Sequence, residues 1–125
     1  MEDFVPFEIA KKLKEKGFPQ HIAEDAYIID NYGEDEYQIG DRLPIPLIPD
    51  YMDDIAAPTI SQVLKWLREE KKLHISIEYG YTEIPVWDFE IRLIGNYGRW
   101  WTDETYSSYE QATLAGIEYV LDNLI

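Results

Sequence analysis

The sequence contains no cysteine, which excludes disulfide bonds, thiolate nucleophiles and cysteine-ligated metal sites. This absence fits a reducing compartment. No apolar run approaches the ~20 residues that a membrane span requires. The first ten residues have neither the basic start nor the apolar centre of a signal peptide. We therefore expect a cytoplasmic protein without membrane contact.

Basic residues are scarce: 11 Lys and Arg stand against 25 Asp and Glu, for a net charge of −14. Because phosphate binding needs a basic surface, direct nucleic-acid binding is not expected. Residues 18–57 hold Arg42 alone against these acids: Glu24, Asp25, Asp30, Glu34, Asp35, Glu36, Asp41, Asp50, Asp53 and Asp54. Such carboxylates could imitate DNA toward a host nucleic-acid-handling protein, or simply keep a small protein soluble.

Catalytic motifs are also missing. The chain has no phosphate-binding or dinucleotide-binding glycine loop, no HExxH and no G-x-S-x-G. Its only histidines are His21 and His74. Asp50, Asp53 and Asp54 supply oxygen ligands for a cation, but their spacing matches no EF-hand loop. We therefore expect no cofactor and no metal, and a solvated acidic loop at these aspartates.

Helix signals are present in three places. Thr59 and Gln62 form a capping box before an apolar stripe that continues through Leu67, with Trp66 beside the stripe. A first helix starts near Pro6 and stops at Gly17 in a Schellman-type end. Ser107 and Glu110 resemble a second capping box, before a last helix whose apolar positions run from Tyr109 to Leu124. This helix is apolar over a wide arc, which the sheet or a partner copy would cover.

Residues 73–94 carry the strongest strand signal, because apolar and polar side chains alternate on both halves. With the turn near Glu83, these side chains face each other: His74 and Arg92, Ser76 and Glu90, Glu78 and Asp88. Residues 99–102 suggest a short third strand, and residues 26–39 a weak hairpin. Four prolines make residues 40–58 an irregular connection rather than a strand.

These elements predict one α+β domain over residues 1–125, with helices packed on one face of a small antiparallel sheet. The order is α-(ββ)-loop-α-ββ(β)-α. No internal repeat or regular parallel crossover unit is present.

Two groups of side chains are candidates for function. Glu78, Asp88 and His74 share the polar face of the hairpin and could serve a small carboxylate-dependent enzyme. We favour an ordinary solvated sheet face, because a flat, wet surface lacks the concave, water-excluded pocket that catalysis needs. The aromatic residues near the hairpin include Tyr79 and Trp87 in the apolar register, where they favour the core. The adjacent Trp100 and Trp101 cannot both face inward in a strand. We therefore select this candidate contact surface: Trp87, Tyr97, Trp100 and Trp101.

Three segments, FEIAKKLKEKGF, APTISQVLKWLREEKKLHISI and YEQATLAGIEYVLDNLI, resemble short uncharacterised proteins of gut Bacteroidales and their phages or prophages. The resemblance spans most of the chain, and APT-x-x-x-x-x-KWLREE is its most specific element. It implies a mobile-element product without an assigned activity. Together the observations predict an acidic binding protein, with a protein partner or self-association and no catalysis.

Overall fold

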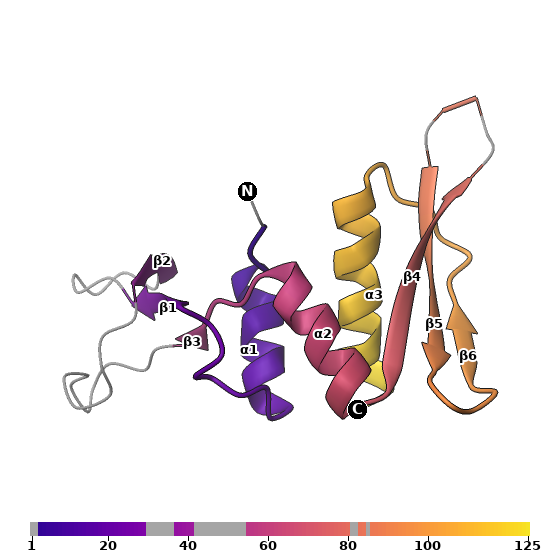
Figure 1. Cartoon of the computed structure of the whole chain (residues 1–125). Helices are drawn as coiled ribbons and strands as arrows, with labels where there is room; N and C mark the ends of the chain where they lie inside the picture. Colours follow the sequence, from indigo (N-terminus) through magenta and orange to yellow (C-terminus); the bar gives the residue numbers. More distant parts are fainter. Residues whose placement is uncertain (1–2, 30–36, 42–54, 81–82, 85) are drawn as a thin grey trace. The chain divides into compact units, whose positions relative to one another are not determined.

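The structure, a computed structural model, describes residues 3–29, 37–41, 55–80, 83–84 and 86–125. The chain divides into two compact units, residues 1–62 and 63–125, with the boundary inside α2 (Ile60–Glu70). The described residues form three helices and two antiparallel sheets, which confirms the predicted α+β class (Figure 1). None of the helices in the described part of the chain has the length and apolar character needed to cross a membrane. The single domain stays a prediction.

Helix α1 (Phe7–Glu15) ends at the predicted glycine stop. Gly17 adopts a φ of 90°, a left-handed conformation that glycine reaches without a steric cost. The Phe18 N–H donates to the Leu13 carbonyl over 2.9 Å, and the Gly17 N–H donates to the Lys14 carbonyl over 3.2 Å. Leu13 and Phe18 are both buried. This pattern confirms the Schellman motif and its apolar contact.

The first unit contains the antiparallel sheet β2–β1–β3, built from β1 (Asp25–Ile29), β2 (Tyr37–Asp41) and β3 (Ile55–Ala56). The first two strands confirm the predicted hairpin. The irregular connection over residues 40–58 is wrong at both ends, where β2 extends to Asp41 and β3 pairs with β1. Ala26 and Ala56 face each other and are buried, so two small side chains bring these backbones together. Residues 42–54 lie outside the described part of the chain.

Helix α2 begins with the predicted capping box. The Thr59 N–H donates to Gln62 Oε1 over 2.9 Å, and the Gln62 N–H donates to Thr59 Oγ1 over 3.2 Å. Val63, Trp66 and Leu67 are buried along this helix. Trp66 is only 6% exposed, so it belongs to the core rather than to a contact surface.

The second unit contains the antiparallel sheet β4–β5–β6, formed by β4 (Leu73–Gly80), β5 (Val86–Leu93) and β6 (Arg99–Trp101). The predicted register is confirmed, since these pairs face each other: His74 and Arg92, Ser76 and Glu90, Glu78 and Asp88. Strand β6 confirms the short third strand, although it ends one residue earlier than expected.

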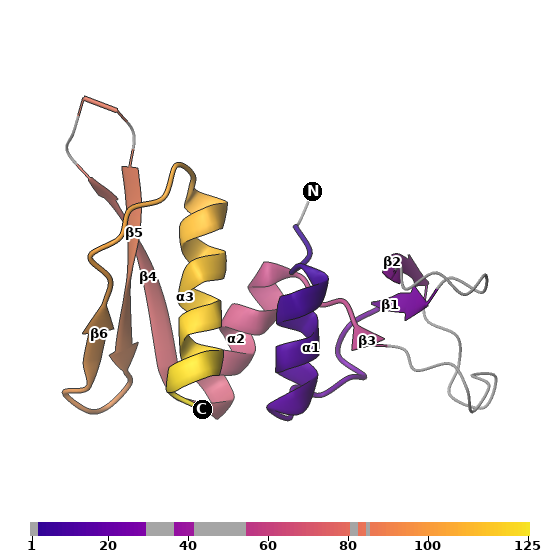
Figure 2. The same ribbon diagram turned by 180° about the vertical axis from the view of Figure 1, so that it is seen from behind.

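Helix α3 (Tyr109–Asn123) lies along one face of this sheet in both views (Figure 1 and Figure 2). Its N-cap is Ser108, whose Oγ accepts the Gln111 N–H over 3.1 Å. The predicted pair Ser107 and Glu110 is therefore wrong by one residue. Both pairs match the spacing of a capping box, and Ser107 instead donates to Gln111 Oε1 over 2.6 Å. The adjacent serines cannot be distinguished by spacing alone.

Gly116 lets α3 approach the sheet closely. A Cβ atom at this position would lie 3.0 Å from Ile75 Cγ2 and 3.3 Å from Phe89 Cγ. We call the side of the sheet that α3 covers the inner face and the opposite side the outer face. Ile117, Val120 and Leu121, in the apolar arc of α3, are at most 1% exposed. At these three residues the apolar arc of α3 is therefore covered within the chain.

Candidate functional site on the outer face

The outer face carries three rows of side chains at right angles to the strands. The alternation that turns Ile75 and Ile91 inward turns their neighbours outward. The cationic row takes its charge from Arg92 and Arg99 and also contains His74. The central row contains Ser76, Glu90 and Trp101, and the acidic row contains Glu78 and Asp88. The face is therefore positive at one end and negative at the other.

Glu90 connects the central row with the cationic row. Its Oε1 accepts the Nε–H of Arg92 over 2.7 Å and forms an ion pair with Arg99, which also reaches Oε2 over 3.2 Å. The side chain of Glu90 is 12% exposed, whereas Arg92 and Arg99 are more than half exposed. Hydrogen bonds from Arg92 and then Arg99 hold the pKa of Glu90 below its ordinary value, and the Glu90 hydrogen bond raises the pKa of Arg92.

This lowered pKa predicts an acid-dependent contribution to stability. A lowered folded pKa stabilises the protein above the ordinary value of about 4.5, and this gain disappears as the pH falls through the folded pKa. We expect Glu90→Gln to lower the free energy of unfolding at neutral pH, with the difference from the original chain shrinking toward about pH 3. Urea unfolding of both proteins between neutral pH and about pH 3 measures this difference, and Glu83→Gln, at an exposed glutamate, is the control. A difference that does not vary with pH would contradict the prediction.

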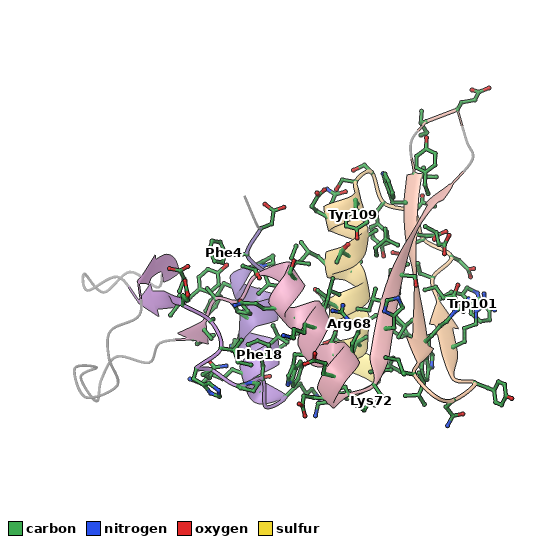
Figure 3. All side chains as sticks on the ribbon, in the orientation of Figure 1. Phe4, Phe18, Arg68, Lys72, Trp101 and Tyr109 are labelled. Carbon is green, nitrogen blue, oxygen red and sulfur yellow. The ribbon has the colours of Figure 1, made fainter. Side chains whose placement is uncertain are left out.

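Trp100 and Trp101 point to opposite faces of the sheet. Trp101 is 65% exposed on the outer face, with the Arg99 guanidinium 5.8 Å from its ring centroid. Trp100 pairs with the inward-facing Ile91 and is half-buried. This arrangement confirms that the two indoles do not both face inward. Figure 3 shows Trp101 on the side of the sheet away from α3.

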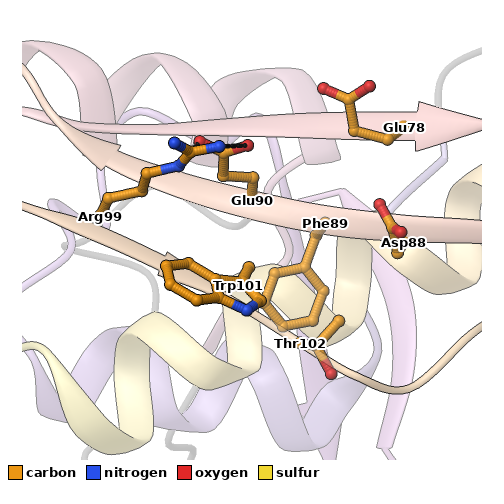
Figure 4. Close-up of a pocket in the computed structure, with 7 residues that line it drawn as sticks. All are labelled: Glu78, Asp88, Phe89, Glu90, Arg99, Trp101 and Thr102. Carbon is orange, nitrogen blue, oxygen red and sulfur yellow. Dashed lines mark hydrogen bonds and ion pairs between the residues drawn. The ribbon is translucent and has the colours of Figure 1, made fainter.

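A hollow of about 540 Å³ opens beside Trp101 (Figure 4). After Trp101 the chain leaves β5 and rejoins it at Tyr106, which exchanges two backbone hydrogen bonds of 2.8 Å with Trp87. The hollow is lined by Glu78, Asp88, Phe89, Glu90, Arg99, Trp101 and Thr102. Glu78 and Trp101 are exposed, so water reaches the groups around it.

His74 does not line this hollow. It lies two residues along β4 from Ser76 and four from Glu78, in the cationic row. A second depression, of about 470 Å³, brings His74 together with Arg92, Arg99 and Tyr97. The structure thus joins Glu78 with Asp88 and separates both from His74.

The four candidate contact residues do not form one surface, and Trp100 is half-buried on the inner face. Tyr97 is fully exposed in the β5–β6 turn, and Trp101 is on the outer face. Trp87 lies near the opposite end of β5, in edge contact with Tyr109, 5.7 Å between ring centroids. Tyr79 also contacts Trp87 but is 49% exposed, so its assignment to the core is wrong. Helix α3 covers the inner face only as far as Tyr109, the first residue of the helix.

The sequence did not identify the role of Arg99 or the sharing of Glu90 between two arginines. The sequence places Glu90 opposite Ser76. It does not specify which strand pairs with β6, so it does not assign Arg99 to one of the three rows. The alternation in Arg99-Trp100-Trp101 was the available signal, because turning Trp100 inward turns both neighbours outward.

The side chains of Asp41, Asp50, Asp53 and Asp54 lie outside the described part of the chain. Within the described part, no three His, Cys, Asp or Glu side chains form a group that could hold a metal ion.

No protein-family model matches the chain, and searches of curated proteins and of solved structures also found no match. The resemblance to proteins of Bacteroidales and their phages stays a prediction.

Proposed function

We propose that this protein acts by binding, to another protein or to a second copy of itself, through the outer face around Trp101, and does not act as a catalyst. The observation that supports this most directly is an indole 65% exposed beside the Arg99 guanidinium. Tryptophan and arginine are enriched among the residues that dominate binding energy at protein interfaces. The polar hollow next to Trp101 provides space for a partner side chain.

The proposed setting is the bacterial cytoplasm, as the product of a phage or prophage. This part of the proposal comes from the sequence resemblance. It determines where to look for a partner: a lysate of a gut Bacteroidales bacterium.

Replacing Trp101 with alanine tests the proposal. We expect Trp101→Ala to weaken the captured complex by at least about 2 kcal/mol, roughly thirtyfold in Kd, the effect typical of a binding hot spot. Affinity capture followed by titration of the purified complex measures it. Tyr109→Ala is the control, because Tyr109 is also an exposed aromatic residue but lies at the start of α3. Equal affinities for both variants would reject the outer face as the binding surface.

The enzyme alternative has one observation in its favour, because Glu78 faces Asp88 at the edge of the hollow. Catalysis by electrostatic stabilisation favours groups shielded from water, and this hollow is open. We therefore favour binding over catalysis as the function of the outer face. The acidic DNA-mimic alternative depends on residues 18–57, where Glu24 and Asp25 are the acids with described side chains. Displacement of the captured partner by excess duplex DNA would favour that alternative.

A further inference from the structure

The outer face has the charge pattern of a self-complementary surface. In a two-fold symmetric dimer the same patch meets itself, so each group must find its complement elsewhere in that patch. Here the cationic row lies two residues on one side of the central row, and the acidic row lies two residues on the other side. A two-fold axis through the central row, at right angles to the strands, would exchange the two ends.

We infer that the outer face binds the outer face of a second copy of this chain, with the strands of the two copies running in opposite directions. This inference rests on the proposed binding function and names its partner. The axis would pass through the level of Ser76, Glu90 and Trp101. Arg92 then meets Asp88 of the other copy, and His74 meets Glu78 of the other copy.

The orientation follows from charge. An axis parallel to the strands would place Arg92 against Arg92 and Asp88 against Asp88, and such like-charge contacts are strongly unfavourable in an interface. In the reversed arrangement Glu90 is the one charged group of the three rows that faces its own copy, and each Glu90 is already paired with Arg92 and Arg99. The two Trp101 indoles would approach each other near the axis, at the β6 edge of the sheet, and provide the apolar part of the contact.

The expected association is weak. Two strands of eight residues and one of three, about 4.8 Å apart, give a patch of roughly 300 Å² per copy. This is less than half of the roughly 800 Å² that a standard interface buries on each partner. A net charge of −14 on each copy adds long-range repulsion, which salt near 0.15 M screens over about 8 Å. We expect a Kd on the order of 100 μM, typical of transient contacts.

The test uses exchanged charges in the intact chain. At concentrations up to about 1 mM, ten times the expected Kd, sedimentation velocity should show dimers of the original chain. Arg92→Asp and Asp88→Arg should each be monomeric, since each places like charges across the axis twice. The double variant R92D/D88R should regain the dimer, and a mixture of the two single variants should form a heterodimer.

Controls separate folding from association. Circular dichroism of every variant confirms the fold, and Glu78→Lys provides a second single variant that leaves Arg92 and Glu90 in place. A monomeric original chain at about 1 mM, or a double variant no better than the single ones, would overturn the inference. If Trp101-dependent capture of a foreign protein persists in that case, the proposed function stands without self-association. If neither association nor capture is seen, both fail.

Discussion

Replacing Trp66 with alanine is expected to lower the free energy of unfolding by about 3–5 kcal/mol, a large part of the total for a small domain. Trp66 is 6% exposed, in the middle of α2, and the Lys71 ammonium lies 5.3 Å from its ring centroid. Removing the indole leaves a large cavity that the surrounding side chains fill only in part. Thermal or urea unfolding, monitored by circular dichroism, measures the loss.

Trp101→Ala is the matched control for Trp66→Ala, because the same substitution is made at an indole 65% exposed. Surface substitutions of this kind usually change stability by no more than about 0.5 kcal/mol. We therefore expect Trp66→Ala to lower the free energy of unfolding and Trp101→Ala to lower the affinity for the partner. A stability loss at Trp101 as large as that at Trp66 would contradict this division.

Phe89→Ala is expected to cost a similar amount, about 3–5 kcal/mol. Phe89 is 3% exposed and packs against α3, where its ring centroid lies 5.9 Å from that of Tyr119. It also stacks with Tyr106 at 6.3 Å, on the segment that returns to β5 after the hollow. Its loss would loosen both the cover of the inner face and one wall of the hollow.

The comparison for Phe89 is Tyr97→Ala, an aromatic residue in the β5–β6 turn that is fully exposed. Urea unfolding of both variants should show a large shift of the midpoint for Phe89→Ala and almost none for Tyr97→Ala. Similar midpoints would mean that Phe89 does not hold α3 on the sheet. A Phe89 variant that remains folded should also bind less well, since the ring lines the hollow.

Local sequence patterns predicted the elements that depend on neighbouring residues. The glycine stop at Gly17 and the box of Thr59 and Gln62 were predicted because their hydrogen bonds span five residues or fewer. The hairpin register of His74 with Arg92 followed from alternation and the position of one turn. The same local information could not decide between Ser107 and Ser108 as the N-cap, because both positions satisfy the same spacing.

Pairing between distant segments needed the tertiary structure. The two residues of β3 pair with β1 across nearly thirty positions of the chain, and nothing in Ile55-Ala56 specifies that partner. The sequence also does not specify that β6 pairs with β5. This pairing puts Arg99 next to Arg92 and brings both to Glu90.

The sequence by itself determined the α+β class, the positions of the three helices and the identity of the side chains on the polar face of the β4–β5 hairpin. These features depend on periodicity and on contacts between near neighbours. The tertiary structure decided that Trp101 faces outward, that Tyr79 is half exposed and that opposite charges lie at opposite ends of the outer face. Those properties arise from the register of β6 and the limited length of α3, which depend on the packing of segments far apart in the chain.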